Sequence, residues 1–141
     1  MTVGATSAGI DAAGNEWKAW AMAVTLLGLR TVIYPSPDLD AAKAWWSTFL
    51  GMEPYFDEDF YVGFEVAGYE LGLLPVGDPA DGAITYWGVD DVAGAFDAAL
   101  AEGATAHAPI SDVGGGIVTA SVTNPLGAIG GFIFNPSFAA R

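Results

Sequence analysis

Residues 29–51, LRTVIYPSPDLDAAKAWWSTFLG, decide the fold of this chain. Apolar and polar residues alternate up to Pro35, which is typical of a strand whose two faces meet different surroundings. Asp38 follows two prolines and can accept hydrogen bonds from the first free amides of a helix. The apolar residues after it recur at helical spacing (Leu39, Ala42, Trp45, Trp46, Phe49 and Leu50), and Gly51 ends the helix.

A fainter copy of this unit returns at residues 83–103, AITYWGVDDVAGAFDAALAEG. When Asp38 is aligned with Asp91, Leu39 falls on Val92 and Thr31 falls on Ile84. Either Asp90 or Asp91 is expected to cap the second helix, which Gly103 ends. Two copies of one supersecondary unit in a chain of 141 residues indicate an internal duplication.

Three strands are predicted after each helix. The first set covers residues 53–57, 60–66 and 69–75, with a turn at Ala67-Gly68, and the second covers 105–109, 117–123 and 128–134. The chain therefore reads as an α+β domain of two βαβββ halves, at residues 29–81 and 82–141. Residues 1–28 read as an extension or leader, with a short helix expected around residues 16–23.

The composition favours a compact, strand-rich fold, since 52% of the residues are hydrophobic and 19 are glycine. Seventeen acidic residues against four basic ones give a net charge of −13, which would repel a nucleic-acid backbone. The apolar run at residues 19–29 is about half the length that crosses a bilayer, and it lacks the flanks of a secretory signal. We therefore expect a cytoplasmic protein without a nucleic-acid or membrane partner.

Cysteine is absent, which excludes disulfides, thiolate nucleophiles and cysteine-ligated zinc. The single histidine, His107, also excludes any site that needs two imidazoles from one chain. His107 itself is expected to be a surface or hydrogen-bonded structural residue.

Three segments carry a resemblance to the vicinal oxygen chelate superfamily, which includes glyoxalase I, extradiol dioxygenases and bleomycin resistance proteins. They are PDLDAAKAWWSTFLG at 37–51, VDDVAGAFDAALAEGA at 89–104 and NPLGAIGGFIFNP at 124–136. The resemblance implies two βαβββ halves that curl their sheets around a cavity, in a homodimer. It leaves open whether the halves pair within one chain or across the dimer.

Metal-dependent members of that superfamily place a histidine on the first strand of each half and a carboxylate or similar group on each last strand. The resemblance puts these positions at Thr31, Ile84, Glu70 and about Phe134. One carboxylate and one hydroxyl are fewer than the three or more strong ligands of a catalytic metal. We therefore predict no metal ion and no other cofactor.

The same strands supply a candidate ligand-binding set. Glu70 is expected to face the cavity, where it could anchor a cation, act as a base with a raised pKa, or be only an exposed strand acid. Period-two alternation predicts an apolar and aromatic wall around it, or else simple core packing, formed by Thr31, Ile33, Ile84, Tyr86, Phe132 and Phe134.

From these features we expect a protein that binds an apolar or cationic small organic molecule and sequesters it in a metal-free cavity. The alternative is a metal-dependent isomerase, lyase or dioxygenase of the same superfamily. A metal-free acid–base enzyme that uses Glu70 or His107 is a third reading, so whether the chain is an enzyme stays open.

Overall fold

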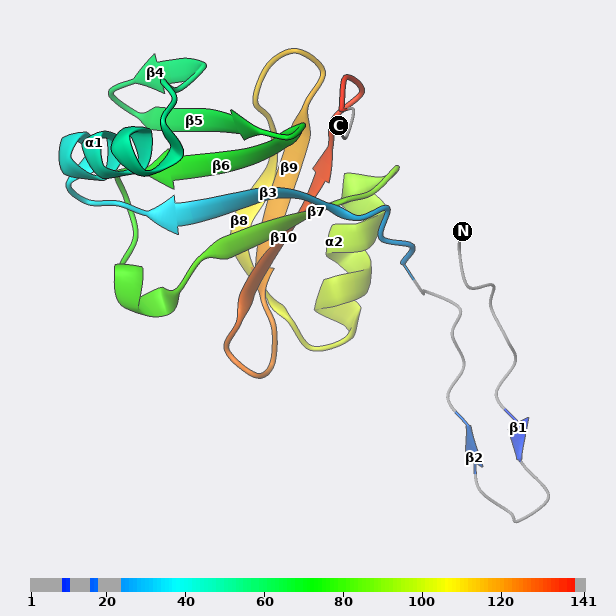
Figure 1. Ribbon diagram of the computed structural model, residues 1–141. Coiled ribbons are helices and arrows are strands. Elements are labelled where there is room, and N and C mark those ends of the chain that lie inside the picture. The colour runs from blue at the N-terminus through cyan, green and yellow to red at the C-terminus, as the bar shows by residue number, and fades with distance from the viewer. Residues whose placement is uncertain (1–8, 11–15, 18–23, 139–141) are drawn as a thin grey trace.

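A computed structural model describes residues 9–10, 16–17 and 24–138 of the chain. Its main body is one curved sheet of eight strands, in the order β4-β5-β6-β3-β7-β10-β9-β8 (Figure 1). The first half contributes β3 (Leu29–Pro35), α1 (Leu39–Leu50), β4 (Phe56–Glu58), β5 (Tyr61–Val66) and β6 (Tyr69–Leu74). The second contributes β7 (Ile84–Gly88), α2 (Val92–Ala101), β8 (Thr105–Asp112), β9 (Val118–Thr123) and β10 (Ile129–Phe134).

The two halves meet inside one chain, at the centre of the sheet. β3 pairs antiparallel with β7, with Thr31 opposite Tyr86 and Ile33 opposite Ile84. Each of these first strands also pairs in parallel with the last strand of its own half, β3 with β6 and β7 with β10. The pairing of the halves that the sequence left open is therefore within the chain, and the predicted α+β fold of two βαβββ units is confirmed.

Local chemistry sets both helix starts. The Asp38 carboxylate accepts a hydrogen bond from the Ala41 amide at 3.1 Å, and Gly51 follows α1 in the left-handed conformation with φ 65°. Asp91, rather than Asp90, caps α2 and accepts from the Gly94 amide at 3.0 Å. A short 3-10 helix, η1 (Pro79–Asp81), lies in the connection between the halves.

Residues 16–17 differ from the sequence expectation. They form β2 (Glu16–Trp17), which pairs with β1 (Gly9–Ile10) in a separate two-stranded sheet. The helix expected from residue 16 is thus wrong at its start, because these residues form an antiparallel pair, and the rest of its range lies outside the described residues. No helix in the described parts of the chain is long and apolar enough to cross a membrane.

Both helices cover the same face of the large sheet. α1 packs on the buried side chains of Val62, Phe64 and Leu73, and α2 packs against Ala120 of β9. The pairs Phe64–Leu71, Leu71–Val32 and Val32–Thr85 run across the sheet, and side chains opposite one another share a face. The core therefore lies between this face and the helices, and the opposite face is not covered by either helix.

Candidate functional site

One transverse row of residues crosses the helix-free face. Its members are paired strand to strand: Glu65 with Glu70, Glu70 with Thr31, Thr31 with Tyr86, Tyr86 with Gly131, and Gly131 with Ser121. Ser121 in turn lies opposite Ala108, next to His107. The row places two acids, three hydroxyls and the histidine on a single line through both halves.

Glu70 is the centre of the first half of this row. It is half-buried, and its two carboxylate oxygens each accept a hydrogen bond, one from the Tyr55 hydroxyl and one from the Tyr61 hydroxyl. Tyr55 and Tyr61 both lie beside Gly63, and Tyr61 also lies over Gly72, where a β-carbon would overlap its hydroxyl. Glycines on β5 and β6 thus make the space in which the tyrosines reach Glu70.

Burial controls the protonation of these tyrosines. It raises the pKa of Tyr55 and of Tyr61 above the usual value, and the neighbouring Glu70 carboxylate raises both further. Both effects disfavour a second negative charge beside Glu70. At neutral pH the pair therefore stays protonated and donates to the carboxylate.

Tyr86 and Ser121 form the polar part of the second half. Burial raises the pKa of Tyr86, and its hydrogen bond with Ser121 acts in the opposite direction. Ser121 is fully buried, and its Oγ lies 2.8 Å from Nδ1 of His107. His107 is thus a hydrogen-bonded residue on a strand, which is one of the two environments expected for it from the sequence.

The structure brings together five of the seven predicted site residues. Thr31, Ile33, Glu70, Ile84 and Tyr86 share the helix-free face.

Phe132 and Phe134 were wrongly placed there. Phe132 lies opposite Ala120 and packs in the α2 core, and Phe134 is two residues along the same strand and so has the same orientation. Gly131 and Ile133 are the β10 residues on the helix-free face, because side chains alternate along the strand.

Five participants were not predicted from the sequence: Tyr55, Tyr61, Glu65, Ser121 and Gly131. Some of these residues could have been predicted from the two-residue turn at Ala67-Gly68, because such a turn fixes the strand register and sets Glu65 opposite Glu70. From that register, Tyr61 and Gly63 fall on the face of Glu70. The contact of Ser121 with His107 could not be predicted from the sequence, since it depends on a shift in the β8–β9 register.

The donor set of the row does not fit a divalent metal ion. Glu70 already accepts from two tyrosines, and its partner positions hold Thr31, Tyr86 and Gly131. Within the described ranges, no group of three or more His, Cys, Asp or Glu side chains could hold a metal ion. Catalytic metals in proteins are held by about three strong ligands.

One hollow of the surface lies away from the row. It encloses about 450 Å³ at the start of α1 and is lined by Asp38, Asp40 and the acids of residues 57–59. A second hollow of about 240 Å³ lies by Trp87 and Phe132, on the side chains of the helix-covered face. We place the candidate site on the row instead, because its polar groups come from both halves, several are hydrogen-bonded to one another, and Thr31 and Ser121 among them are buried.

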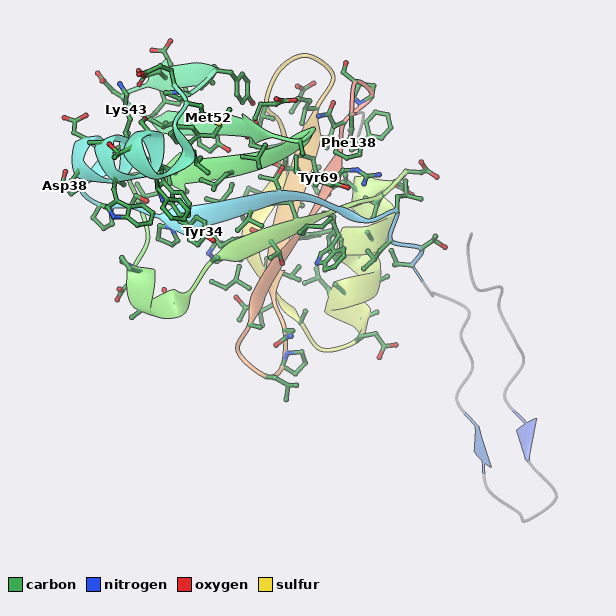
Figure 2. All side chains as sticks on the ribbon, in the orientation of Figure 1. Tyr34, Asp38, Lys43, Met52, Tyr69 and Phe138 are labelled. Carbon is green, nitrogen blue, oxygen red and sulfur yellow. The ribbon has the colours of Figure 1, made fainter. Side chains whose placement is uncertain are left out.

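The C-terminal segment packs against the sheet beside Arg30 and Tyr69. The Arg30 guanidinium lies 3.8 Å from the centre of the Phe138 ring and against Gly88. Phe138 also contacts Tyr69, with ring centres 5.6 Å apart (Figure 2). The cation–π contact thus holds residue 138 against the sheet.

Comparisons with known proteins agree with this fold. The family model described as Glyoxalase/Bleomycin resistance protein/Dioxygenase superfamily matches residues 28–128. Comparison with curated protein sequences finds no match.

Among solved structures, the Mn(II)-bound glyoxalase from Novosphingobium aromaticivorans is similar, with a TM-score of 0.63 and 18% identity over 84% of this chain and 42% of that chain. A variant of methylmalonyl-CoA epimerase from Streptomyces coelicolor, in complex with 2-nitronate-propionyl-CoA, has a TM-score of 0.61 and 15% identity over 80% of this chain and 100% of its own. A glyoxalase/bleomycin resistance protein/dioxygenase superfamily member from Vibrio splendidus 12B01 has a TM-score of 0.57 and 18% identity over 76% of this chain and 99% of its own. These likenesses show the fold, and the family match covers well over half of the sequence. The chain therefore belongs to the glyoxalase/bleomycin resistance protein/dioxygenase superfamily.

Proposed function

We propose that this protein binds a small organic cation with an apolar body at Glu70, on the helix-free face, and acts by holding it. The observation that carries the proposal is the half-buried Glu70 carboxylate, fixed by two tyrosine hydroxyls and lying opposite a second acid, Glu65. A carboxylate offers about four acceptor positions, so two remain for a ligand. Because its position is set in advance, little ordering is needed when a ligand binds.

The surroundings of Glu70 suit a cation better than an anion. The rings of Tyr55 and Tyr61 flank the carboxylate, and aromatic faces attract cations by about 0.5–2 kcal/mol each. The net charge of −13 adds a long-range attraction for cations and repels anions. Ile33, half-buried on the same face, can help to bury the apolar part at about 25 cal/mol per Å².

The metal-dependent alternative draws support from the Mn(II)-bound glyoxalase of the same fold. It requires about three strong ligands, and the row offers one carboxylate that already accepts from two tyrosines beside Thr31, Tyr86 and Gly131. Metal analysis of the purified protein separates the two: a stoichiometric divalent ion, removed by chelator together with an isomerase, lyase or dioxygenase activity, would overturn the binding proposal.

The binding proposal is tested by calorimetry with phenyltrimethylammonium and its neutral isostere tert-butylbenzene. The cation is expected to bind and the isostere to bind at least tenfold more weakly, because only the cation uses the carboxylate. Bleomycin, a cationic glycopeptide suggested by the family name, is a second probe.

The control compares two substitutions that remove the same charge. Glu70→Gln is expected to weaken phenyltrimethylammonium binding by about ten- to a hundredfold, since contacts to a charged group contribute about 1.5–3 kcal/mol. Asp97→Asn, on an exposed position of α2, leaves the affinity nearly unchanged. Equal effects of the two variants would mean that only net charge matters and that Glu70 is not the site.

A further inference from the structure

The Tyr86 side chain has a fixed place in the second half of the row. Its ring lies over Gly131, so closely that a β-carbon at Gly131 would overlap the ring. Along the row Tyr86 is separated from Glu70 only by Thr31, which is 7% exposed. Strands in a sheet are about 4.8 Å apart, so the backbones at Glu70 and Tyr86 are about 10 Å apart. The Tyr86 ring extends away from Glu70, across Gly131 of β10 to Ser121 of β9, so the two binding points are farther apart than these backbones.

A chain of hydrogen bonds leads from the surface to the Tyr86 hydroxyl. Ser121, fully buried on β9, contacts the Tyr86 hydroxyl on one side and Nδ1 of His107 on the other. His107 is exposed and lies where the β8–β9 register shifts between Ala106 and Ala108. Such a bulge turns a side chain away from its regular direction, which here directs the imidazole to Ser121.

The direction of these hydrogen bonds decides what Tyr86 can do. Ser121 has a single hydroxyl hydrogen, so it donates to only one of its two neighbours. His107 carries its hydrogen on Nδ1 in one of its two neutral tautomers, and in that tautomer it donates to Ser121 and leaves the Ser121 hydrogen for Tyr86. With Nδ1–H of His107 donating to Ser121, and Ser121 donating to Tyr86, the Tyr86 hydrogen is left for a third acceptor.

We propose that the Tyr86 hydroxyl is a second binding point of the site and donates a hydrogen bond to an uncharged oxygen of the ligand, such as a ketone, ester or amide carbonyl. Ser121 and His107 are its positioning residues. The inference rests on the proposed function, because it adds this point to the cation site at Glu70. An uncharged oxygen fits better than an oxyanion, since Glu65 and Glu70 lie on the same row. The ligand class is thus an organic cation that carries a carbonyl oxygen at its other end.

The test uses calorimetry with two series of trimethylammonium probes. One series ends in a methyl ketone, the other in an alkyl group of the same length, and the alkyl spacer is lengthened stepwise in both. At the spacer that spans the two points, the ketone is expected to bind about three- to tenfold more tightly than its alkyl partner, which is the effect of one hydrogen bond. Tyr86→Phe is expected to abolish this preference.

The matched control is Tyr34→Phe. Tyr34 stacks on Trp46 of α1, on the helix-covered face, so the preference for the ketone should persist in this variant. If ketone and alkyl probes bind wild-type protein equally at every length, the second binding point is overturned while the cation site stands. If neither series binds, the cation site fails and this inference fails with it.

Two further measurements test the positioning residues. In Ser121→Ala, NMR of ring-labelled tyrosine should show Tyr86 ionising at higher pH than in wild type, because a donor to the phenolate has been lost; ionisation at lower pH would reverse the hydrogen-bond direction and overturn the proposal. His107→Asn retains a donor near the Nδ1 position and should keep the ketone preference, whereas His107→Leu should lose it. A purely structural His107 would instead change the stability of both variants and leave the preference intact.

Discussion

Two glycines decide where the tyrosines of the site can lie. Gly72 leaves room for the Tyr61 hydroxyl that reaches Glu70, and Gly131 leaves room for the Tyr86 ring. Neither glycine has a positive φ, so their role is space rather than backbone conformation. Glycine inside a strand often marks such a close approach.

Gly131→Ala is therefore expected to destabilise the protein by about 1–3 kcal/mol, the usual cost of overpacking. The new β-carbon would meet the Tyr86 ring and lie 3.0 Å from the Ala120 carbonyl oxygen. Gly130→Ala is the control, because nothing lies within 4 Å of a β-carbon there. Urea unfolding of both variants measures the difference, and equal stabilities would contradict this account of Gly131.

Alkaline pH is expected to destabilise the fold through the same tyrosines. Burial raises the pKa of Tyr55, Tyr61 and Tyr86 above the usual value of 10. Above about pH 10 the unfolded chain loses these protons while the folded chain keeps them, so the free energy of unfolding falls as pH rises. Below pH 10 both states are protonated and the contribution is fully present.

Urea unfolding at pH values from about 8 to 11 checks this expectation. Tyr61→Phe should reduce the fall in the free energy of unfolding at alkaline pH. This variant distinguishes the tyrosines from Lys43, whose pKa is raised by its hydrogen bond with Asp57. A wild-type stability that stays constant above pH 10 would contradict the prediction.

Among the secondary-structure elements, the helix caps show how local chemistry places the site. Asp38 and Asp91 begin α1 and α2 directly after the central strands β3 and β7. Both helices then pack on the same face of the sheet, so neither covers the other face. Trp46 of α1 packs on the core, whereas Trp45 and Phe49 stack on each other and are 57% and 69% exposed.

Asp91→Ala should cost about 1 kcal/mol of stability, because the Gly94 amide loses its acceptor. Asp90→Ala removes the same charge from the exposed neighbouring position and should change stability by less than about 0.5 kcal/mol. Thermal unfolding of the two variants distinguishes them. A larger loss for Asp90→Ala would mean that the cap is assigned to the wrong residue.

For the whole molecule, the duplication produces one sheet with two separate cores. Val62, Phe64 and Leu73 form one beneath α1, and Val89, Val92, Ala95 and Ala120 form the other beneath α2. The halves are joined along β3 and β7, so the row of polar residues can draw on both. The homodimer expected from the family resemblance stays a prediction, which sedimentation equilibrium can check.

Added salt is expected to stabilise the protein. Seventeen acidic residues against four basic ones repel one another in the compact state, and salt shortens the range of this repulsion from about 30 Å at 0.01 M to about 8 Å at 0.15 M. The midpoint of thermal unfolding should therefore rise with sodium chloride over this range. A fall would show that favourable ion pairs, such as Lys43 with Asp57, outweigh the repulsion.

Most elements and the family could be predicted from local patterns. Strands, caps and turns depend on neighbouring residues, and helix α1 begins and ends where Asp38 and Gly51 indicate. Alternation along β3 and β7 grouped Thr31 with Ile33 and Ile84 with Tyr86 on one face, which the strand register bears out, whereas their role in binding stays a prediction. The same rule applied to β10 chose the wrong face for Phe132.

The sequence by itself determined the doubled βαβββ order, the caps of the helices and the acidic character of the protein, because these depend on residues close together in the chain or on composition alone. Only the tertiary structure decided which face of each strand is open, which tyrosines reach Glu70, and that Ser121 connects His107 to Tyr86. The physical reason is that alternation divides a strand into two faces without saying which one the helices cover. That choice is made by strand register and helix packing, which join residues far apart in the chain.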